Sequence, residues 1–147
     1  MTTQRSPGSK RLLLIVFGLI VAAGVFAACG GGDDASTSQT GIRLATPTDA
    51  AALLDDGVIQ PVVLDVRTPE EFGEGHLEGA VLIDFYGNDF KDTLSELDRD
   101  LPYVIYCRSG NRSGQTREIM TDLGFTDVVD IDGGITAWQA DGLPTVG

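Results

Sequence analysis

The chain has 147 residues, with 10 Lys and Arg against 22 Asp and Glu, a formal charge of -12, two cysteines and one histidine. That length allows one ordinary domain, and the excess of acid argues against a nucleic-acid partner, because neutralising phosphates requires clustered Lys and Arg. Two cysteines and one histidine also exclude a scaffold of several disulfides and most Cys/His zinc sites, so we expect no metal and no cofactor.

Residues 1–28 are predicted to be an export signal. They contain three basic residues and no acid, and the run 12–28 is uncharged. As a helix this run would span about 26 Å, slightly less than the ~30 Å hydrocarbon core of a membrane. A basic flank, an apolar run and small residues are typical of a signal peptide. Residues 26–30 (FAACG) resemble the lipobox of bacterial lipoproteins, which implies that Cys29 is diacylated and becomes the mature N-terminus. The alternative is an uncleaved anchor helix.

Residues 29–41 are predicted to form the lipidated N-terminus and a flexible tether. The stretch after Cys29 (GGGDDASTSQTG) has no large apolar residue, so it cannot contribute to a core. We therefore expect one domain over residues 42–147, a monomer on the extracytoplasmic side of the cell membrane whose only membrane contact is the lipid anchor. Without the signal, 7 basic and 22 acidic residues remain, a charge near -15.

In the first part of this domain, short apolar runs alternate with helix signals. Thr46 followed by Pro47 predicts the start of a helix. The run 62–66 (VVLDV) predicts a strand covered on both faces. Thr68 and Glu71 have the spacing of a capping box, which predicts a second, short helix.

The alternation continues to the end of the chain. Apolar residues from Phe90 to Leu101 recur at helical spacing. Strands are predicted at 81–83, 103–106 and within 125–131, and helices at 113–123 and around Trp138. Alternating strands and helices predict an α/β fold with a mostly parallel sheet, helices on both faces and ligands at the C-terminal ends of the strands.

Cys107 stands where such a fold binds ligands, between a strand and a short loop that leads into a helix. Gly110 and Asn111 can adopt positive φ, so the loop can turn its backbone N–H groups toward one point. These amides, the helix dipole, and Arg108 and Arg112 all favour an anion. We therefore predict a Cys107 thiolate whose pKa lies below the usual value of about 8.5.

Three segments in this order resemble rhodanese-type sulfurtransferases. The segment 107–113 (CRSGNRS) is similar to the active-site loop, 64–67 (LDVR) with 75–80 (GHLEGA) to an early signature, and 133–138 (GGITAW) to the closing signature. The resemblance covers essentially all of residues 42–143. It implies a single rhodanese-like domain in which Cys107 accepts a sulfane sulfur as a persulfide and passes it to a thiophilic acceptor.

The resemblance also implies the substrates and the residues that contact them. The donor would be a small sulfur-containing anion such as thiosulfate, and the acceptor cyanide or a thiol. The active loop that binds them would consist of Arg108, Ser109, Gly110, Asn111, Arg112 and Ser113. Arg112 would point into the loop region, whereas Arg108 is expected near its rim.

Asp65 and Arg67 follow the strand at 62–66, and we expect them to support the loop rather than to react. Asp65 is predicted to pair with an arginine of the active loop, namely Arg112. His76, the only histidine, is expected to be structural. Trp138 is expected to bury its ring beneath the loop. Because three of the seven basic residues outside the signal lie close to Cys107, the sequence predicts an acidic body with one local basic site.

Two alternatives to a sulfurtransferase remain open. Thiolate phosphatases and arsenate reductases use five residues between cysteine and arginine, whereas four separate Cys107 from Arg112. A tighter loop suits a sulfur atom better than a phosphoryl group with three equatorial oxygens. The other alternative is a persulfide carrier or a redox-sensing module that does not turn over.

Overall fold

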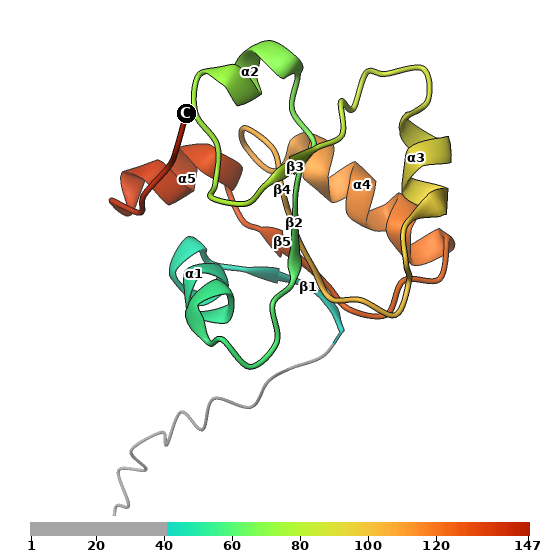
Figure 1. Cartoon of the computed structure of the whole chain (residues 1–147), viewed down its shortest axis with the longest axis horizontal. Coiled ribbons are helices and arrows are strands. Elements are labelled where there is room, and N and C mark those ends of the chain that lie inside the picture. Colours follow the sequence, from blue (N-terminus) through green and yellow to red (C-terminus); the bar gives the residue numbers. More distant parts are fainter. Residues whose placement is uncertain (1–40) are drawn as a thin grey trace, which may run out of the picture. The chain divides into compact units, whose positions relative to one another are not determined.

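The computed structural model describes residues 41–147, which form a five-stranded sheet between two layers of helices (Figure 1). The strands are β1 (Ile42–Ala45), β2 (Val62–Asp65), β3 (Val81–Leu82), β4 (Tyr103–Tyr106) and β5 (Val128–Ile131). Their order across the sheet is β1-β5-β4-β2-β3, and every pair is parallel. The predicted α/β class is therefore confirmed, with β4 in the middle of the sheet.

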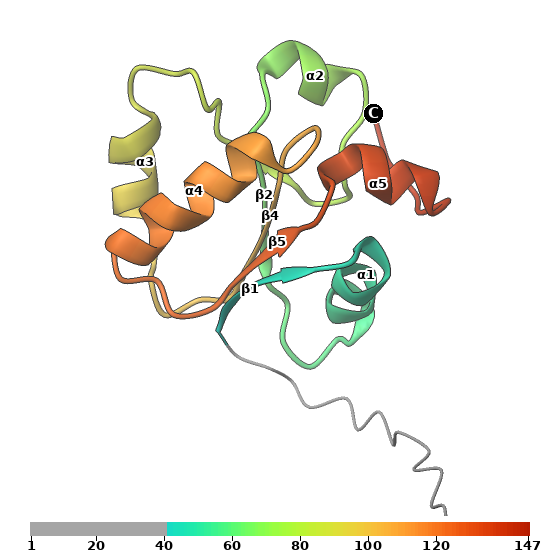
Figure 2. The ribbon, with the colours of Figure 1, turned by 180° about the vertical axis from the view of Figure 1, so that it is seen from behind.

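Five helices accompany the strands. They are α1 (Pro47–Asp55), α2 (Pro69–Gly73), α3 (Phe90–Glu96), α4 (Asn111–Asp122) and α5 (Gly134–Ala140). Helices α1 and α5 cover one face of the sheet and α3 and α4 cover the other, as both views show (Figures 1 and 2). Helix α2 lies beyond the C-terminal end of β2, so it borders the edge where parallel sheets bind ligands.

The sheet divides the apolar interior into two cores because side chains alternate along each strand. On the α3 and α4 side, Ile105 of β4 packs with Leu94 and Met120. On the α1 and α5 side, Val104 packs with Ala50 and Trp138. All four residues of β4 are buried, as expected for a central strand with helices on both faces.

The predicted helix caps are present. The Thr46 side chain accepts a hydrogen bond from the Asp49 amide at the start of α1. At α2, the Thr68 hydroxyl accepts from the Glu71 amide while the Glu71 carboxylate accepts from the Thr68 amide. Both halves of the predicted capping box therefore form.

Strands β2 and β3 and helix α4 each end one residue earlier than predicted, and three larger differences concern β1, α3 and the start of α4. Strand β1 was not predicted, because it is a short edge strand that pairs only with β5 and leaves Leu44 half exposed. Helix α3 stops before Leu97, whose backbone is extended, so Leu101 does not extend the helical stripe and stays exposed. Helix α4 begins at Asn111, two residues earlier than predicted.

The predictions about residues 1–40, including the signal and Cys29, lie outside the residues that the structure describes. Within residues 41–147, no helix is both long enough and apolar enough to cross a membrane.

Candidate active site

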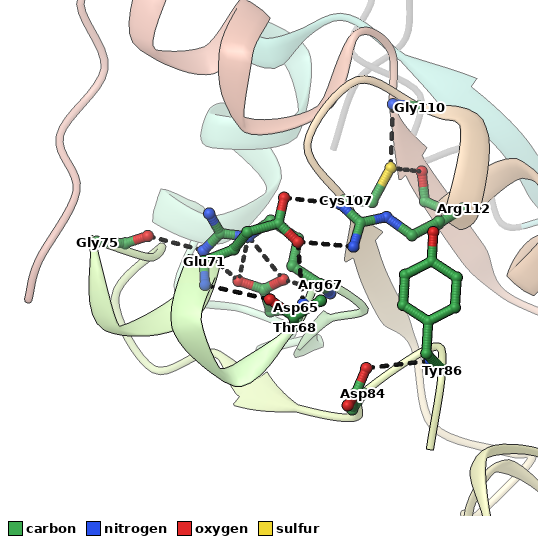
Figure 3. Close-up of polar contacts among 11 residues, drawn as sticks. Asp65, Arg67, Thr68, Glu71, Gly75, Asp84, Tyr86, Cys107, Gly110 and Arg112 are labelled. Atoms are coloured by element: carbon green, nitrogen blue, oxygen red, sulfur yellow. Dashed lines mark hydrogen bonds and ion pairs between the residues drawn. The ribbon is translucent and has the colours of Figure 1, made fainter. Parts of the chain in front are cut away.

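The Cys107 side chain lies at the C-terminal end of β4, the predicted position for a reactive group. It is a free thiol and only 1% exposed. The Gly110 amide donates a hydrogen bond to its Sγ at 3.1 Å, and the Ser113 hydroxyl lies 3.5 Å from the same sulfur (Figure 3). Gly110 has a φ of 93°, a left-handed conformation that turns its amide toward the sulfur. Asn111, in contrast, is the first residue of α4 and not a second residue with positive φ.

Opposing influences set the pKa of Cys107. Burial, the largest, raises the pKa because it disfavours the thiolate. Hydrogen bonds from the Ser113 hydroxyl and from the backbone amides of Ser113, Ser109 and Gly110 lower it, and together they outweigh burial. The pKa of the thiol therefore lies below its ordinary value, in the predicted direction, and hydrogen-bond donors account for the shift.

Backbone hydrogen bonds from the first residues of α5 hold the active loop in place. The Ile135 amide donates to the Cys107 carbonyl at 2.9 Å, and the Thr136 amide donates to the Arg108 carbonyl at 3.1 Å. These contacts bring the predicted closing signature directly against the predicted active loop. They require a close approach of two backbones, which Gly134 permits because it has a φ of 59° and no side chain.

The prediction that Asp65 pairs with Arg112 is wrong. Asp65 accepts two-pronged hydrogen bonds from the Arg67 side chain, with 2.6 Å between Arg67 Nη2 and Asp65 Oδ2. The same Nη2 atom donates to the Gly75 carbonyl at 2.7 Å. Asp65 is fully buried and Arg67 is 4% exposed, so this pair fixes the segment between the two parts of the early signature. Because Arg67, two residues further along, already pairs with Asp65, Arg112 is available to pair with a different acid.

That other acid is Glu71. The Arg112 guanidinium donates to both oxygens of the Glu71 carboxylate, at 2.7 and 2.8 Å (Figure 3). Arg112 lowers the pKa of Glu71 to about 2, chiefly by this hydrogen bonding. Glu71 also closes the capping box of α2 through the Thr68 amide, so one carboxylate joins the starts of α2 and α4. The sequence identified Glu71 as a cap, but only the fold shows that it restrains the active loop.

The predicted local basic site is largely neutralised. Arg112 is paired with Glu71, and the Nε of Arg117 lies 3.8 Å from a carboxylate oxygen of Asp130. Arg108 is exposed, in keeping with its expected place at the rim, and takes part in no ion pair within residues 41–147. Amides and the Ser113 hydroxyl, rather than a surplus of positive charge, therefore stabilise the thiolate.

The two remaining predicted side chains have structural contacts. The His76 ring stacks on Phe72 with 3.8 Å between centroids, and its Nδ1 lies 3.1 Å from the Phe72 carbonyl oxygen. Trp138 is 4% exposed, and its indole N–H donates to the Pro144 carbonyl. Within residues 41–147, no group of three His, Cys, Asp or Glu side chains is placed to bind a metal ion.

Glu71→Gln is expected to reduce the free energy of unfolding at pH 7 by about 1 to 3 kcal/mol, because a charge-assisted, bidentate contact is lost. The pKa of Glu71 falls from an ordinary 4.5 to about 2 on folding. Its stabilising effect is therefore complete above pH 4.5 and disappears as the pH falls through about 2. Urea denaturation between pH 7 and 2.5 would show the difference between wild type and variant shrinking. Glu70→Gln, an exposed neighbour in the same turn, is the matched control, and equal effects of the two variants would contradict the prediction.

The fold and the site together define an α/β domain in which a buried cysteine with a lowered pKa lies between a central strand and a helix N-terminus. Residues 46–141 match the Rhodanese-like domain family, so the chain belongs to that family. Over 101 residues it is 33% identical to the thiosulfate sulfurtransferase GlpE of Pseudomonas syringae, covering 69% of this chain and 91% of that protein.

Other relatives place the same domain in different settings. The chain is 35% identical over 106 residues to the probable adenylyltransferase/sulfurtransferase MoeZ of Mycobacterium tuberculosis. That match covers 72% of this chain but only 26% of MoeZ, so the chain spans about a quarter of that protein. Among solved structures, a rhodanese-related protein from Thermoplasma volcanium superposes with a TM-score of 0.61 at 32% identity, covering 71% of this chain and 97% of the other.

Proposed function

We propose that the protein is an enzyme that transfers a sulfane sulfur from a thiosulfate-like donor, through a Cys107 persulfide, to cyanide or a thiol. The observation that supports this most directly is the buried Cys107 thiol, whose pKa is lowered by hydrogen-bond donors while no general base within residues 41–147 bonds to its sulfur. The thiosulfate sulfurtransferase GlpE, which aligns with most of this domain, supports the choice of donor.

Two displacements complete the proposed cycle. The Cys107 thiolate attacks the outer sulfur of thiosulfate, the bond between the two donor sulfurs breaks, and its electron pair leaves with sulfite. The negative charge then lies on the outer sulfur of the Cys107 persulfide. An acceptor such as cyanide attacks that outer sulfur, thiocyanate departs, and the thiolate is restored. Amide donors around the sulfur favour both anionic states, because they are already oriented.

The size of the loop favours sulfur transfer over phosphoryl transfer. Four residues separate Cys107 from Arg112, and Arg112 donates to both oxygens of Glu71. A phosphatase would need this guanidinium for the equatorial oxygens of a phosphoryl group. The Glu71 carboxylate competes for the same donors, whereas a single sulfur atom can use the Gly110 amide.

The test is a thiosulfate and cyanide assay on the full chain in detergent, followed by intact-protein mass spectrometry. We expect thiocyanate to form, and protein treated with thiosulfate alone to gain about 32 Da that cyanide then removes. Sulfur uptake without thiocyanate would identify a persulfide carrier instead of an enzyme. Hydrolysis of an aryl phosphate without sulfur uptake would reject both.

We also propose that the domain is displayed outside the cytoplasmic membrane on a lipid attached to Cys29. The support is the sequence of residues 1–30 alone. Growth of the expressing bacterium with labelled palmitate should label the wild-type protein but not Cys29→Ala. Equal labelling of both, or of neither, would reject lipidation at Cys29.

A further inference from the structure

Asp130 is a buried acid that the mechanism above does not use. It lies in β5 and its side chain is 1% exposed, yet neither carboxylate oxygen has a hydrogen-bond partner. Within residues 41–147 its one ion-pair contact is with Arg117, whose Nε lies 3.8 Å from Asp130 Oδ2. The Arg117 side chain is 27% exposed. Burying a carboxylate with so little compensation is costly, so this position calls for a physical explanation.

Ser113 contacts the reactive sulfur and lies one helical turn before Arg117, the residue of α4 that reaches Asp130. It lies in the first turn of α4, is fully buried, and its hydroxyl is 3.5 Å from Cys107 Sγ. Its hydroxyl makes no hydrogen bond to Asp130 in this structure, but it lies close enough to lower the pKa of that carboxyl. A serine hydroxyl has one hydrogen, so it can donate to the Asp130 carboxylate or to the Cys107 thiolate, but not to both at once.

The surroundings of Asp130 allow its charge to change near neutral pH. Burial, the largest influence, raises the pKa of Asp130 to about 6. Ser113 and Arg117 on α4 lower it, whereas the negative charge of Asp132 raises it. Across the sheet, its partners in register are the apolar residues Leu44 on β1 and Ile105 on β4.

We propose that Asp130 is a positioning residue for Cys107: when charged it draws the Ser113 hydrogen away from the sulfur, and when neutral it releases that hydrogen to the sulfur. The charged form deprives the thiolate of one donor and adds a nearby negative charge, and both effects make the thiolate more basic and a stronger nucleophile. A neutral Asp130 leaves the Ser113 hydroxyl free to stabilise the thiolate.

A second consequence rests on the proposed sulfur transfer. When a persulfide forms, the negative charge moves from Cys107 Sγ to the outer sulfur, one bond further from Ser113. A charged Asp130 therefore favours the sulfur-loaded state over the free thiolate, because it repels the charge on Sγ more strongly than the charge on the outer sulfur. Asp130 would then link sulfur loading to pH.

The test measures the alkylation rate of Cys107 by iodoacetamide between pH 4.5 and 9, followed on the Cys107 peptide by mass spectrometry so that Cys29 does not interfere. In wild type, the alkylation rate plotted against pH is not expected to fit a single titration, because the protonations of Asp130 and Cys107 are coupled. Asp130→Asn keeps the shape, removes the charge and leaves one titration. We expect its Cys107 acid dissociation constant to be at least about threefold larger.

The control variants separate the Ser113 route from a general effect of charge. Asp132→Asn removes an exposed acid two residues away and is expected to change the dissociation constant less than twofold. In a Ser113→Ala background, Asp130→Asn should have a smaller effect than in wild type, because only the direct charge repulsion remains. An unchanged titration in Asp130→Asn, or an equal shift with and without Ser113, would overturn the proposal. Because alkylation needs no sulfur donor, a failed thiocyanate assay would leave this result standing.

Discussion

Cys107→Ser is expected to lower thiosulfate-dependent thiocyanate formation by at least about 10³-fold, to the level of the uncatalysed reaction. The serine hydroxyl is nearly isosteric with the thiol, so the buried site should keep its packing. An alcohol remains protonated where the thiol ionises, and a serine cannot form a persulfide. The variant should therefore show no mass increase of about 32 Da after thiosulfate, and steady-state assays with mass spectrometry would measure both effects.

The matched control for this variant is Ser109→Ala in the same loop. Ser109 is exposed, and its backbone amide, which favours the Cys107 thiolate, survives the substitution. We expect its turnover to stay within about twofold of wild type, because the group that acts on the sulfur is unchanged. Persistent thiocyanate formation by Cys107→Ser would show that another group performs the reaction and would reject the proposed cycle.

Much of the fold could be predicted because its signals are local. The Thr68–Glu71 capping box and the apolar run of β4 depend on residues adjacent in sequence, and both form as expected. Strand β1 escaped prediction because an edge strand needs only one partner and one buried face, so its four residues show no continuous apolar run. The end of α3 was misplaced because Leu101 fits the spacing of the stripe, yet the chain turns away at Leu97.

The position of the reactive cysteine could be predicted from the sequence, whereas the ion pairs around it could not. The position of Cys107 follows from a strand, a glycine and a helix start within one short segment. The partner of Arg112 does not, because Glu71 lies 41 residues away and sequence distance gives no preference among many acids. Spacing did offer one clue for Asp65, since Arg67 is close enough to compete for it before any distant arginine can.

The charge of the site differs from the prediction because its ion pairs also join residues that are distant in sequence. Arginines near Cys107 in sequence predict a basic patch, but folding brings Glu71 to Arg112 and Asp130 to Arg117. Acidic residues outnumber basic ones 22 to 10 in this chain, so carboxylates are available to pair with arginines in the folded protein. Neutral donors such as the Gly110 amide can stabilise the anion at Cys107, and unlike the paired arginines they need not first lose a carboxylate partner.

Gly134→Ala is expected to have the other large effect, on both stability and activity. Gly134 has a φ of 59°, and a Cβ there would overlap the Cys107 carbonyl oxygen and lie 2.8 Å from the Arg108 carbonyl carbon. These are backbone atoms of the active loop, so they cannot move aside as a side-chain tip can. The left-handed conformation costs about 1 to 2 kcal/mol for alanine, and the overlap about 1 to 3 kcal/mol more. Displacing Cys107 should also reduce turnover at least tenfold, because reactive geometry tolerates little misplacement.

Gly142→Ala separates these two costs. Gly142 has a φ of 74°, but a Cβ added there meets no atom within 4 Å. This variant should lose only the 1 to 2 kcal/mol of the left-handed conformation and keep near-normal turnover. Urea denaturation gives the two stabilities, and thiocyanate formation is measured where circular dichroism shows both variants folded. If the two alanine variants matched in turnover, the contact between α5 and the Cys107 loop would not be what positions the sulfur.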